Sequence, residues 1–400
     1  RLNAPIVDST GCEIYTHRLA IDDGSLDANW DPYPGGVAVT TNLNSIARDV
    51  RIAGTPDGAY LAWTDYRYSS GYPNFTNRDV YMQYLLSQTG SWPTGSAWMQ
   101  NGVNVIPAPV VDQQHPELVL DFKRRSGKYG VLVVYESNPM SGPWQVYASG
   151  FDAGGNAVFQ DLRVAPSSAN QRLPQIASTG SWTQAPPWGA LVAWEDSRSP
   201  FTGIDIYAGH IDEAGQSFWG AGKALCTAAG DQQRPRVVAQ GTFGAAVWED
   251  NRDAGATGSD IYINVVDMQN GHPYWLDNSA SPICAYAEDQ LTPELDFDPS
   301  GGMVYVCWED QRDIASDPSD IYVQGFEVSN PSSLRWVENG IPVTQAKQAQ
   351  VLPRISGETI VWQDARRDPI QNDLADDENI YAGVIGTECD NPTDMRMRDV

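Results

Sequence analysis

The sequence predicts an all-β protein built from one repeated unit, and three observations lead to this prediction. Short apolar runs separated by Gly, Pro and Asn occupy the chain, and few segments have the spacing of an amphipathic helix. A segment containing Trp-Glu-Asp and then Asp-Ile-Tyr occurs in near-copies that begin at Val192, Ala246 and Val306. Gln followed two or three residues later by Pro precedes the copies, for example at Gln232 and Gln290. Repetition of this kind indicates a repeat architecture.

Six repeats are found when the copies are aligned on a Trp, or on a Tyr in one of them. The marker positions are Trp63, Tyr135, Trp194, Trp248, Trp308 and Trp362. Their spacing ranges from 54 residues (Trp194 to Trp248) to 72 residues (Trp63 to Tyr135), which is enough for four short strands. Four-stranded units repeated radially form a β-propeller, and a β-solenoid is the alternative.

Each repeat contains four strands in a fixed order. Strand A begins at the Gln signature and ends at a tight turn such as 240–244. Strand B carries the Trp, a variable loop follows, strand C carries Asp-Ile-Tyr, and strand D is the outer strand after a second turn such as 212–215. We expect a single domain over residues 1–400, with repeats at 41–107, 108–165, 166–222, 223–281, 282–340 and 341–390 and a tail at 391–400.

Residues 1–40 are expected to close the ring. Residues 12–24 resemble strand C but have no strand A or B before them. They would complete the sheet of the last repeat, so that pairing of the N- and C-terminal segments leaves no sheet edge open. The count predicts six blades, with seven as the alternative.

The spacing within the repeat predicts how strands B and C pair. Residues two apart in a strand share a face, so the Trp, Asp and Arg of Trp-Glu-Asp-x-Arg point the same way. If each Trp pairs with the Tyr of strand C, the Asp of strand B faces the Asp of strand C, with the Arg beside both. The predicted clamps are Asp196, Arg198 and Asp205; Asp250, Arg252 and Asp260; and Asp310, Arg312 and Asp320.

Two facing carboxylates could act as general acid and base, as in glycoside hydrolysis. A catalytic pair is needed once, however, and this pair is written three times, so we interpret the clamps as structural. As exposed ion pairs they would contribute only ~0–1 kcal/mol each, and their main effect would be to fix the register of the hairpin.

With these residues, the repeat resembles that of TolB-type β-propellers. The resemblance is carried by a strand ending in Asp-x-Arg, a loop, and an Asp-Ile-Tyr strand running to Asp-x-x-Gly, as in the segment from Trp194 to Gly215. It covers about residues 41–390. It implies six blades, a periplasmic, secreted or surface-exposed bacterial protein, and a propeller that binds other proteins. It implies no catalytic residues.

Function is expected where the copies differ. The B–C loop of the first repeat is rich in aromatic residues, which could stack on sugar rings, anchor a protein partner, or fold back over their own loop. These residues are Tyr66, Tyr68, Tyr72 and Phe75. The B–C loop of the last repeat is acidic and is either a calcium site or a solvated loop. Its candidate ligands are Asp373, Asp376, Asp377 and Glu378, and no other cofactor is expected.

The opposite face carries two further candidate contacts. Lys123, Arg124 and Arg125 lie in a basic turn, which either meets an acidic partner or is simply hydrated. Trp182 and Trp188 lie in the longer A–B turn of the third repeat and could form a second apolar contact.

Charge and motif content exclude several function classes. With 51 acidic and 25 basic residues the net charge is −26, which disfavours nucleic acid and anionic membranes as partners. No run approaches the ~20 apolar residues of a membrane-spanning helix. The chain has no Gly-x-Ser-x-Gly elbow, phosphate loop or Cys-x-x-Cys motif, so we name no catalytic residue.

The five cysteines fit an oxidising compartment. We predict a Cys12–Cys389 disulfide at the closing blade, the alternative being chain ends too flexible to meet. Cys226 and Cys284 occupy equivalent positions in adjacent repeats, and Cys307 is expected to be a buried apolar residue.

Together these features predict a non-catalytic β-propeller that is secreted, periplasmic or on the cell surface. It would serve as a structural or interaction module for a protein or glycan partner, or as one part of a larger extracellular assembly. The alternative is a carbohydrate-active enzyme, either a glycoside hydrolase or a polysaccharide lyase.

Overall fold

A computed structural model describes residues 13–16, 37–41, 46–67, 77–106, 111–125, 128–138, 142–180, 189–276, 280–365 and 379–385, without the side chains of 122–128. All the regular structure within these ranges is β-strand, which confirms the all-β prediction. No described segment forms a helix of the length and apolarity needed to cross a bilayer. The chain divides into two compact units, Arg1–Val192 with Gly209–Ala221 and Ala193–Ala208 with Gly222–Val400.

The first unit contains the strands of the first two repeats. They are β1 (Tyr15–Thr16), β2 (Val37–Ala38), β3 (Ala47–Thr55), β4 (Gly58–Asp65), β5 (Asp79–Leu86), β6 (Val103–Asn104), β7 (Asp112–Arg125), β8 (Lys128–Asn138), β9 (Gln145–Phe151) and β10 (Ala157–Arg163), followed by β11 (Gln171–Ser178). Strands β12 (Ala190–Asp196) and β13 (Asp205–Ile211) are divided between the two units.

The second unit contains the remaining strands. They are β14 (Lys223–Cys226), β15 (Gln232–Gln240), β16 (Phe243–Asp250), β17 (Asp260–Asp267), β18 (Ser281–Cys284), β19 (Gln290–Phe297), β20 (Met303–Asp310), β21 (Asp320–Glu327), β22 (Asn330–Leu334), β23 (Ile341–Thr344), β24 (Gln350–Ser356), β25 (Thr359–Asp364) and β26 (Asn379–Val384).

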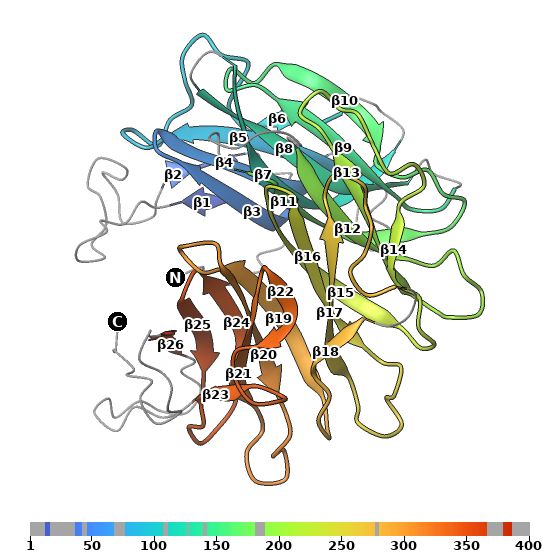
Figure 1. Cartoon of the computed structure of the whole chain (residues 1–400). Coiled ribbons are helices and arrows are strands. Elements are labelled where there is room, and N and C mark those ends of the chain that lie inside the picture. The colour runs from blue at the N-terminus through green and yellow to red at the C-terminus, as the bar shows by residue number, and fades with distance from the viewer. Residues whose placement is uncertain are drawn as a thin grey trace, which may run out of the picture. The chain divides into compact units, whose positions relative to one another are not determined.

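Each repeat forms one antiparallel sheet in which consecutive strands are neighbours (Figure 1). The sheet orders are β3-β4-β5-β6, β10-β9-β8-β7, β11-β12-β13-β14, β15-β16-β17-β18, β19-β20-β21-β22 with β23 also on β21, and β24-β25-β26. Sequential four-stranded sheets of this kind are the blades of a β-propeller, as the sequence predicted.

The predicted pairing of strands B and C is confirmed where the register is defined. Trp248 lies opposite Tyr262 and Asp250 opposite Asp260. The same alignment places Asp310 opposite Asp320. The first repeat, whose copy is more diverged, follows the same rule with Asp65 opposite Asp79.

The Gln-x-x-Pro signature marks a β-bulge in strand A. The residue before the Pro has a positive φ, 53° at Arg234 and 49° at Thr292, and the pairing with strand B shifts at that point. The bulged amide is bound by the Glu of the preceding repeat's Trp-Glu-Asp. Arg234 N donates to Glu195 Oε1 and Thr292 N donates to Glu249 Oε1, each at 2.8 Å. The two sequence signatures therefore meet and join one sheet to the next.

The outer strands pair with the preceding repeat. Strands β14, β18 and β23 pair with β13, β17 and β21 respectively. They begin at or just beyond the expected repeat boundaries at 222, 281 and 340, so each sheet extends a few residues past its expected end. A glycine precedes the last of them because a Cβ at Gly340, where φ is 74°, would lie 2.5 Å from the Trp308 ring.

The N-terminal ribbon lies on the first repeat. β1 pairs with β2, and Ile14 and Val39 join an apolar cluster with Trp63 and Tyr81. The sheet of the last repeat has three strands in the described part of the chain. Pairing of residues 12–24 with that sheet stays a prediction.

Candidate functional site

The repeated Trp, Asp, Arg and Tyr form one group at the end of the B–C hairpin in the first, third, fourth and fifth repeats. In the fourth repeat the Trp248 indole N–H donates to Asp250 Oδ2 at 2.9 Å. Arg252 donates from Nε and Nη2 to the two oxygens of Asp250 at 2.9 and 2.6 Å. The guanidinium carbon lies 3.9 Å from the centre of the Tyr262 ring. The group recurs with Asp65, Arg67 and Tyr81; Asp196, Arg198 and Tyr207; and Asp310, Arg312 and Tyr322.

The clamp differs from its sequence prediction in burial and in symmetry. Asp250 is 0% exposed and Asp260 is 1% exposed, so the expectation of an exposed ion pair is wrong. Arg252 binds Asp250, whereas Asp260 accepts a 2.9 Å hydrogen bond from Thr257 Oγ1. Arg198 binds Asp196 in the same way, and Asp205 accepts from Thr202 Oγ1 at 3.0 Å. The Arg therefore pairs with strand B, and a hydroxyl supports the carboxyl of strand C.

The carboxyl of strand C has a raised pKa. Oδ1 is buried without a hydrogen-bond partner in Asp205, Asp260 and Asp320. Burial, together with the charge of the facing strand B carboxylate, raises the pKa of Asp205 and of Asp260 to about 6. Burial and the charges of Asp317 and Asp310 raise the pKa of Asp320 to about 7.

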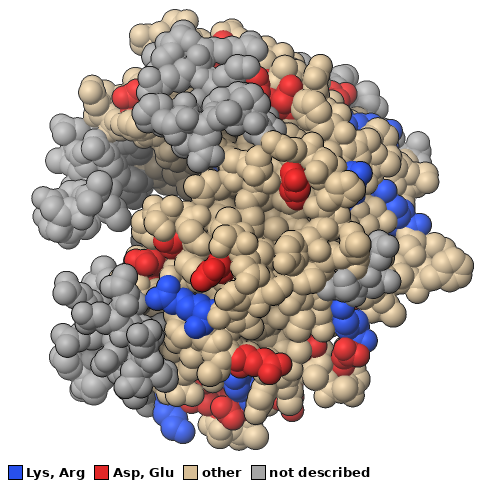
Figure 2. Space-filling model, viewed as in Figure 1, with Lys and Arg blue, Asp and Glu red and all other residues tan. Residues whose placement is uncertain are grey.

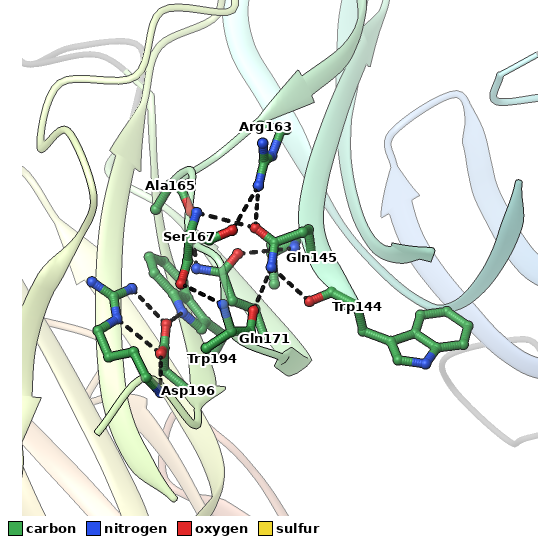
Figure 3. Close-up of polar contacts among 11 residues, drawn as sticks. Trp144, Gln145, Arg163, Ala165, Ser167, Gln171, Trp194 and Asp196 are labelled. Carbon is green, nitrogen blue, oxygen red and sulfur yellow. Dashed lines mark hydrogen bonds and ion pairs between the residues drawn. The ribbon is translucent and has the colours of Figure 1, made fainter. Parts of the chain in front are cut away.

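The second repeat holds the same place with neutral groups. Tyr135 faces Tyr147 and Ser137 faces Gln145, in the register of the other repeats. Gln145 Oε1 accepts from Arg163 Nη2, and Gln145 Nε2 donates to the Ala169 and Trp144 carbonyls at 2.5 and 2.9 Å (Figure 3). An amide network therefore replaces the carboxyl pair, and Gln145 itself carries no charge.

Trp144 is held rigidly by its backbone while its ring extends away from the Gln145 network (Figure 3). Its N–H donates to Asn170 Oδ1 at 2.9 Å and its carbonyl accepts from Gln171 N at 2.8 Å. Two guanidinium groups lie over the ring, Arg172 at 4.9 Å and Arg78 at 5.4 Å from the ring centre. Arginine and tryptophan in this geometry attract each other through the ring quadrupole.

Glu136 holds Arg172 in place through an ion pair. Its fully buried carboxylate accepts hydrogen bonds from Arg172 Nε at 2.8 Å, His115 Nδ1 at 2.9 Å and Leu173 N at 2.7 Å. Burial by itself would raise the pKa of Glu136, but the hydrogen bond from His115 and the charges of His115 and Arg172 outweigh it and hold the pKa below its usual value. The Arg172 side chain is 37% exposed, so it keeps access to solvent.

Arg78 extends the group towards the first repeat. It binds Asp112 through Nε and Nη2 and is hydrogen-bonded to the Tyr66 hydroxyl. Arg48 lies 6.0 Å from the centre of the Tyr66 ring. We call Trp144, Arg78, Arg172, His115 and Glu136 the Trp144 cluster, with Tyr66 and Arg48 at its edge.

The cluster brings several arginines together in an acidic protein. Acidic and basic side chains are interspersed on the face seen in Figure 2, and acidic residues outnumber basic ones 51 to 25 in the chain. Three arginines and two aromatic residues nevertheless meet here, next to the B–C loop of the first repeat. The cluster is therefore our candidate functional site.

Among the predicted ligand-binding residues, Tyr66 is the one the structure describes in full. Tyr68, Tyr72, Phe75, Trp182 and Trp188 lie outside the described residues, as do the calcium candidates Asp373, Asp376, Asp377 and Glu378 and the cysteines Cys12 and Cys389. Lys123, Arg124 and Arg125 lie in β7 with side chains that are not described. Cys226, Cys284 and Cys307 are free and buried, as expected for Cys307.

The sequence reasoning missed Trp144, Arg78 and Arg172. One signal in the sequence could have pointed to Trp144. The three near-identical copies have Gly-Ile, Gly-Ser or Pro-Ser directly before the Asp of strand C, whereas the second repeat has a large aromatic residue, Trp144, directly before Gln145. Within the described ranges, no three His, Cys, Asp or Glu side chains are arranged to hold a metal ion.

Comparison with known proteins gives likeness to solved structures alone. No protein-family model and no curated protein matches the chain. An α-L-arabinanase from Penicillium chrysogenum complexed with arabinobiose is 13% identical, with a TM-score of 0.36 over 66% of this chain and 76% of that chain. A protein of unknown function from Dyadobacter fermentans is 12% identical, with a TM-score of 0.44 over 86% and 95%. An α-L-arabinofuranosidase from Fusarium graminearum is 12% identical, with a TM-score of 0.41 over 86% and 98%. At these identities the likeness does not extend to activity.

Proposed function

We propose that this β-propeller is a glycan-binding module whose Trp144 cluster holds a saccharide bearing carboxylate groups. The observation that carries the proposal is the meeting of Arg78, Arg172 and Trp144 in a chain of net charge −26. Arg172 is 37% exposed and is bonded to Glu136 through Nε, so it is the guanidinium that would bind a carboxylate of the ligand. Arg78 is already paired with Asp112 through Nε and Nη2 and would hold the Trp144 ring in place. Aromatic rings pack against the apolar faces of sugars. The rigid backbone of Trp144 supports the proposal further, because a site ordered before binding loses less entropy.

A panel of neutral and carboxylated oligosaccharides tests this function. We expect the purified chain to bind carboxylated members, and Trp144→Ala and Arg172→Ala each to weaken binding about 30-fold, the loss typical of a central contact residue. Arg234→Ala is the matched control. Arg234 also pairs with a Glu of strand B, at 3.0 Å, so the substitution removes the same charge at a place outside the Trp144 cluster. Binding that is equal in all four proteins would overturn the proposal.

A carbohydrate-active enzyme is the second candidate, and Asp79 favours it. Burial and the facing charge of Asp65 raise the pKa of Asp79 to about 6, in the range of a general acid, and Asp79 follows Arg78 directly. The pKa values of Asp205 and Asp260 are raised in the same way by burial within the repeated clamp, which we interpret as structural. A raised pKa at Asp79 therefore does not single it out as catalytic, and binding is our first choice. Release of reducing ends, or of unsaturated products, that disappears in Asp79→Asn would establish the enzyme instead.

The resemblance to TolB-type repeats supports a secreted, periplasmic or cell-surface location. Fractionation of the producing cells tests it, and recovery from the cytoplasm would contradict it.

A further inference from the structure

The loops between strands B and C of the fourth and fifth repeats have the same backbone. Both contain nine residues, 251–259 and 311–319. In the fourth repeat Thr257 N donates to Asp253 O at 3.0 Å, and in the fifth Asp317 N donates to Asp313 O at 2.9 Å. The preceding hydrogen bonds also correspond, from Ala256 N to Asp253 O and from Ser316 N to Asp313 O, each at 2.8 Å. Asp317 therefore occupies the position of Thr257.

This single exchange removes a hydrogen-bond donor from the hairpin end. Thr257 supports Asp260, and Thr202 supports Asp205, each through its hydroxyl. An ionised Asp317 has no proton to donate to Asp320. The sequence of the first repeat follows the threonine pattern as well, with Thr76 three residues before Asp79. The fifth repeat thus differs from its neighbours in one defined respect.

The result is two carboxyl groups with unmet acceptor atoms. Oδ1 of Asp320 is buried without a hydrogen-bond partner, as Oδ1 is in Asp205 and Asp260, and Asp320 is 5% exposed. The exchange adds a second such atom in the fifth repeat, Oδ1 of Asp317. Asp317 occupies the position of Thr257, whose Oγ1 lies 2.9 Å from Asp260 Oδ2, so the carboxyls of Asp317 and Asp320 lie close together. Arg312 cannot serve both, because its Nε and Nη2 bind Asp310 at 2.8 and 2.7 Å. Buried acceptors of this kind require a partner.

We propose that Asp317 and Asp320 bind a calcium ion at the hairpin end of the fifth repeat. Calcium accepts carboxylate, peptide carbonyl and water oxygens in a flexible shell of six to eight ligands, so two carboxylates suffice when the loop and solvent complete it. The exposed Asp313 adds negative charge beside the pair. The site is independent of the glycan-binding proposal, since none of its residues belongs to the Trp144 cluster.

Calorimetric titration of the full chain with calcium chloride tests the site. We expect Asp317→Thr to remove one binding site with a Kd of about 10⁻⁴–10⁻³ M, the range of extracellular calcium modules. The variant restores the Thr of the fourth repeat and is therefore expected to fold, which circular dichroism checks. Asp253→Asn is the matched control, because it removes one acidic charge from the equivalent loop and should leave the site count unchanged.

A gain-of-site variant gives a second, separate readout. Thr257→Asp copies the fifth repeat onto the fourth and should add one calcium site. Equal calcium titrations of the natural chain and Asp317→Thr would overturn the proposal, because the two carboxyls would then be satisfied by a shared proton.

Discussion

The second and fourth repeats have B–C hairpins of the same register that end in different polar groups. At the end of its B–C hairpin the fourth repeat buries Asp250 and Asp260 beside a partly exposed Arg252, whereas the second repeat buries Ser137 and Gln145. Both hairpins keep the same register, with the aromatic residues of the two strands opposite each other. In the second repeat the Tyr135 and Tyr147 rings are stacked, with centres 6.3 Å apart.

The comparison shows that the charged clamp does not set the register. The apolar strand faces and the aromatic pair are common to both repeats, and the ion pair is not. The clamp instead satisfies the buried indole N–H of Trp248, a group that Tyr135 lacks. The second repeat lacks the clamp, and the position directly before its strand C residue Gln145 is occupied by Trp144, the centre of the candidate site.

The largest difference between the two repeats is expected at the strand B carboxylate. Asp250→Ala should lower the free energy of unfolding by about 3–5 kcal/mol, because Arg252 and the Trp248 N–H would lose their buried partner. Ser137→Ala, the matching change in the second repeat, should cost about 1 kcal/mol. Urea unfolding followed by tryptophan fluorescence measures both, and equal losses would show that the clamp is not the feature that separates them.

The arginine of the clamp should have a smaller effect. Arg252→Ala is expected to cost about 2–3 kcal/mol, because Asp250 keeps its hydrogen bonds from the Trp248 indole and from the backbone N–H of residue 252. Saccharide binding should be unchanged, since residue 252 lies outside the Trp144 cluster. Binding lost while the fold is retained would contradict a structural role for the clamp.

The smallest effect is a difference in pH dependence. Asp260 has its pKa raised to about 6, above its ordinary value of 3.8, so between about pH 4 and 6 the folded chain holds this proton more tightly than the unfolded chain. The protonated Asp260 carboxyl therefore stabilises the folded chain at low pH, and this stabilisation is lost as the pH rises through 6. Asp260→Asn should raise the free energy of unfolding by about 1–2 kcal/mol at pH 7.5 and leave it unchanged at pH 4.

Gln145→Asp provides the reverse test of this pH effect in the second repeat. It should introduce a loss of stability above pH 6 where the natural chain has none from this position. A variant with the same pH profile as the natural chain would show that the neutral amide of the second repeat is not what distinguishes it.

The sequence alone determined the repeat, the strand order and the pairing of strands B and C. These follow from alternation within a strand and from the spacing of Trp248, Asp250, Asp260 and Tyr262, all of which are local in the chain. Tertiary structure decided the rest. Which carboxylate takes the arginine depends on side-chain geometry and burial, and neither is visible in the spacing. The Trp144 cluster joins Arg78, Trp144 and Arg172 from three different repeats, so only the packing of successive sheets brings them together.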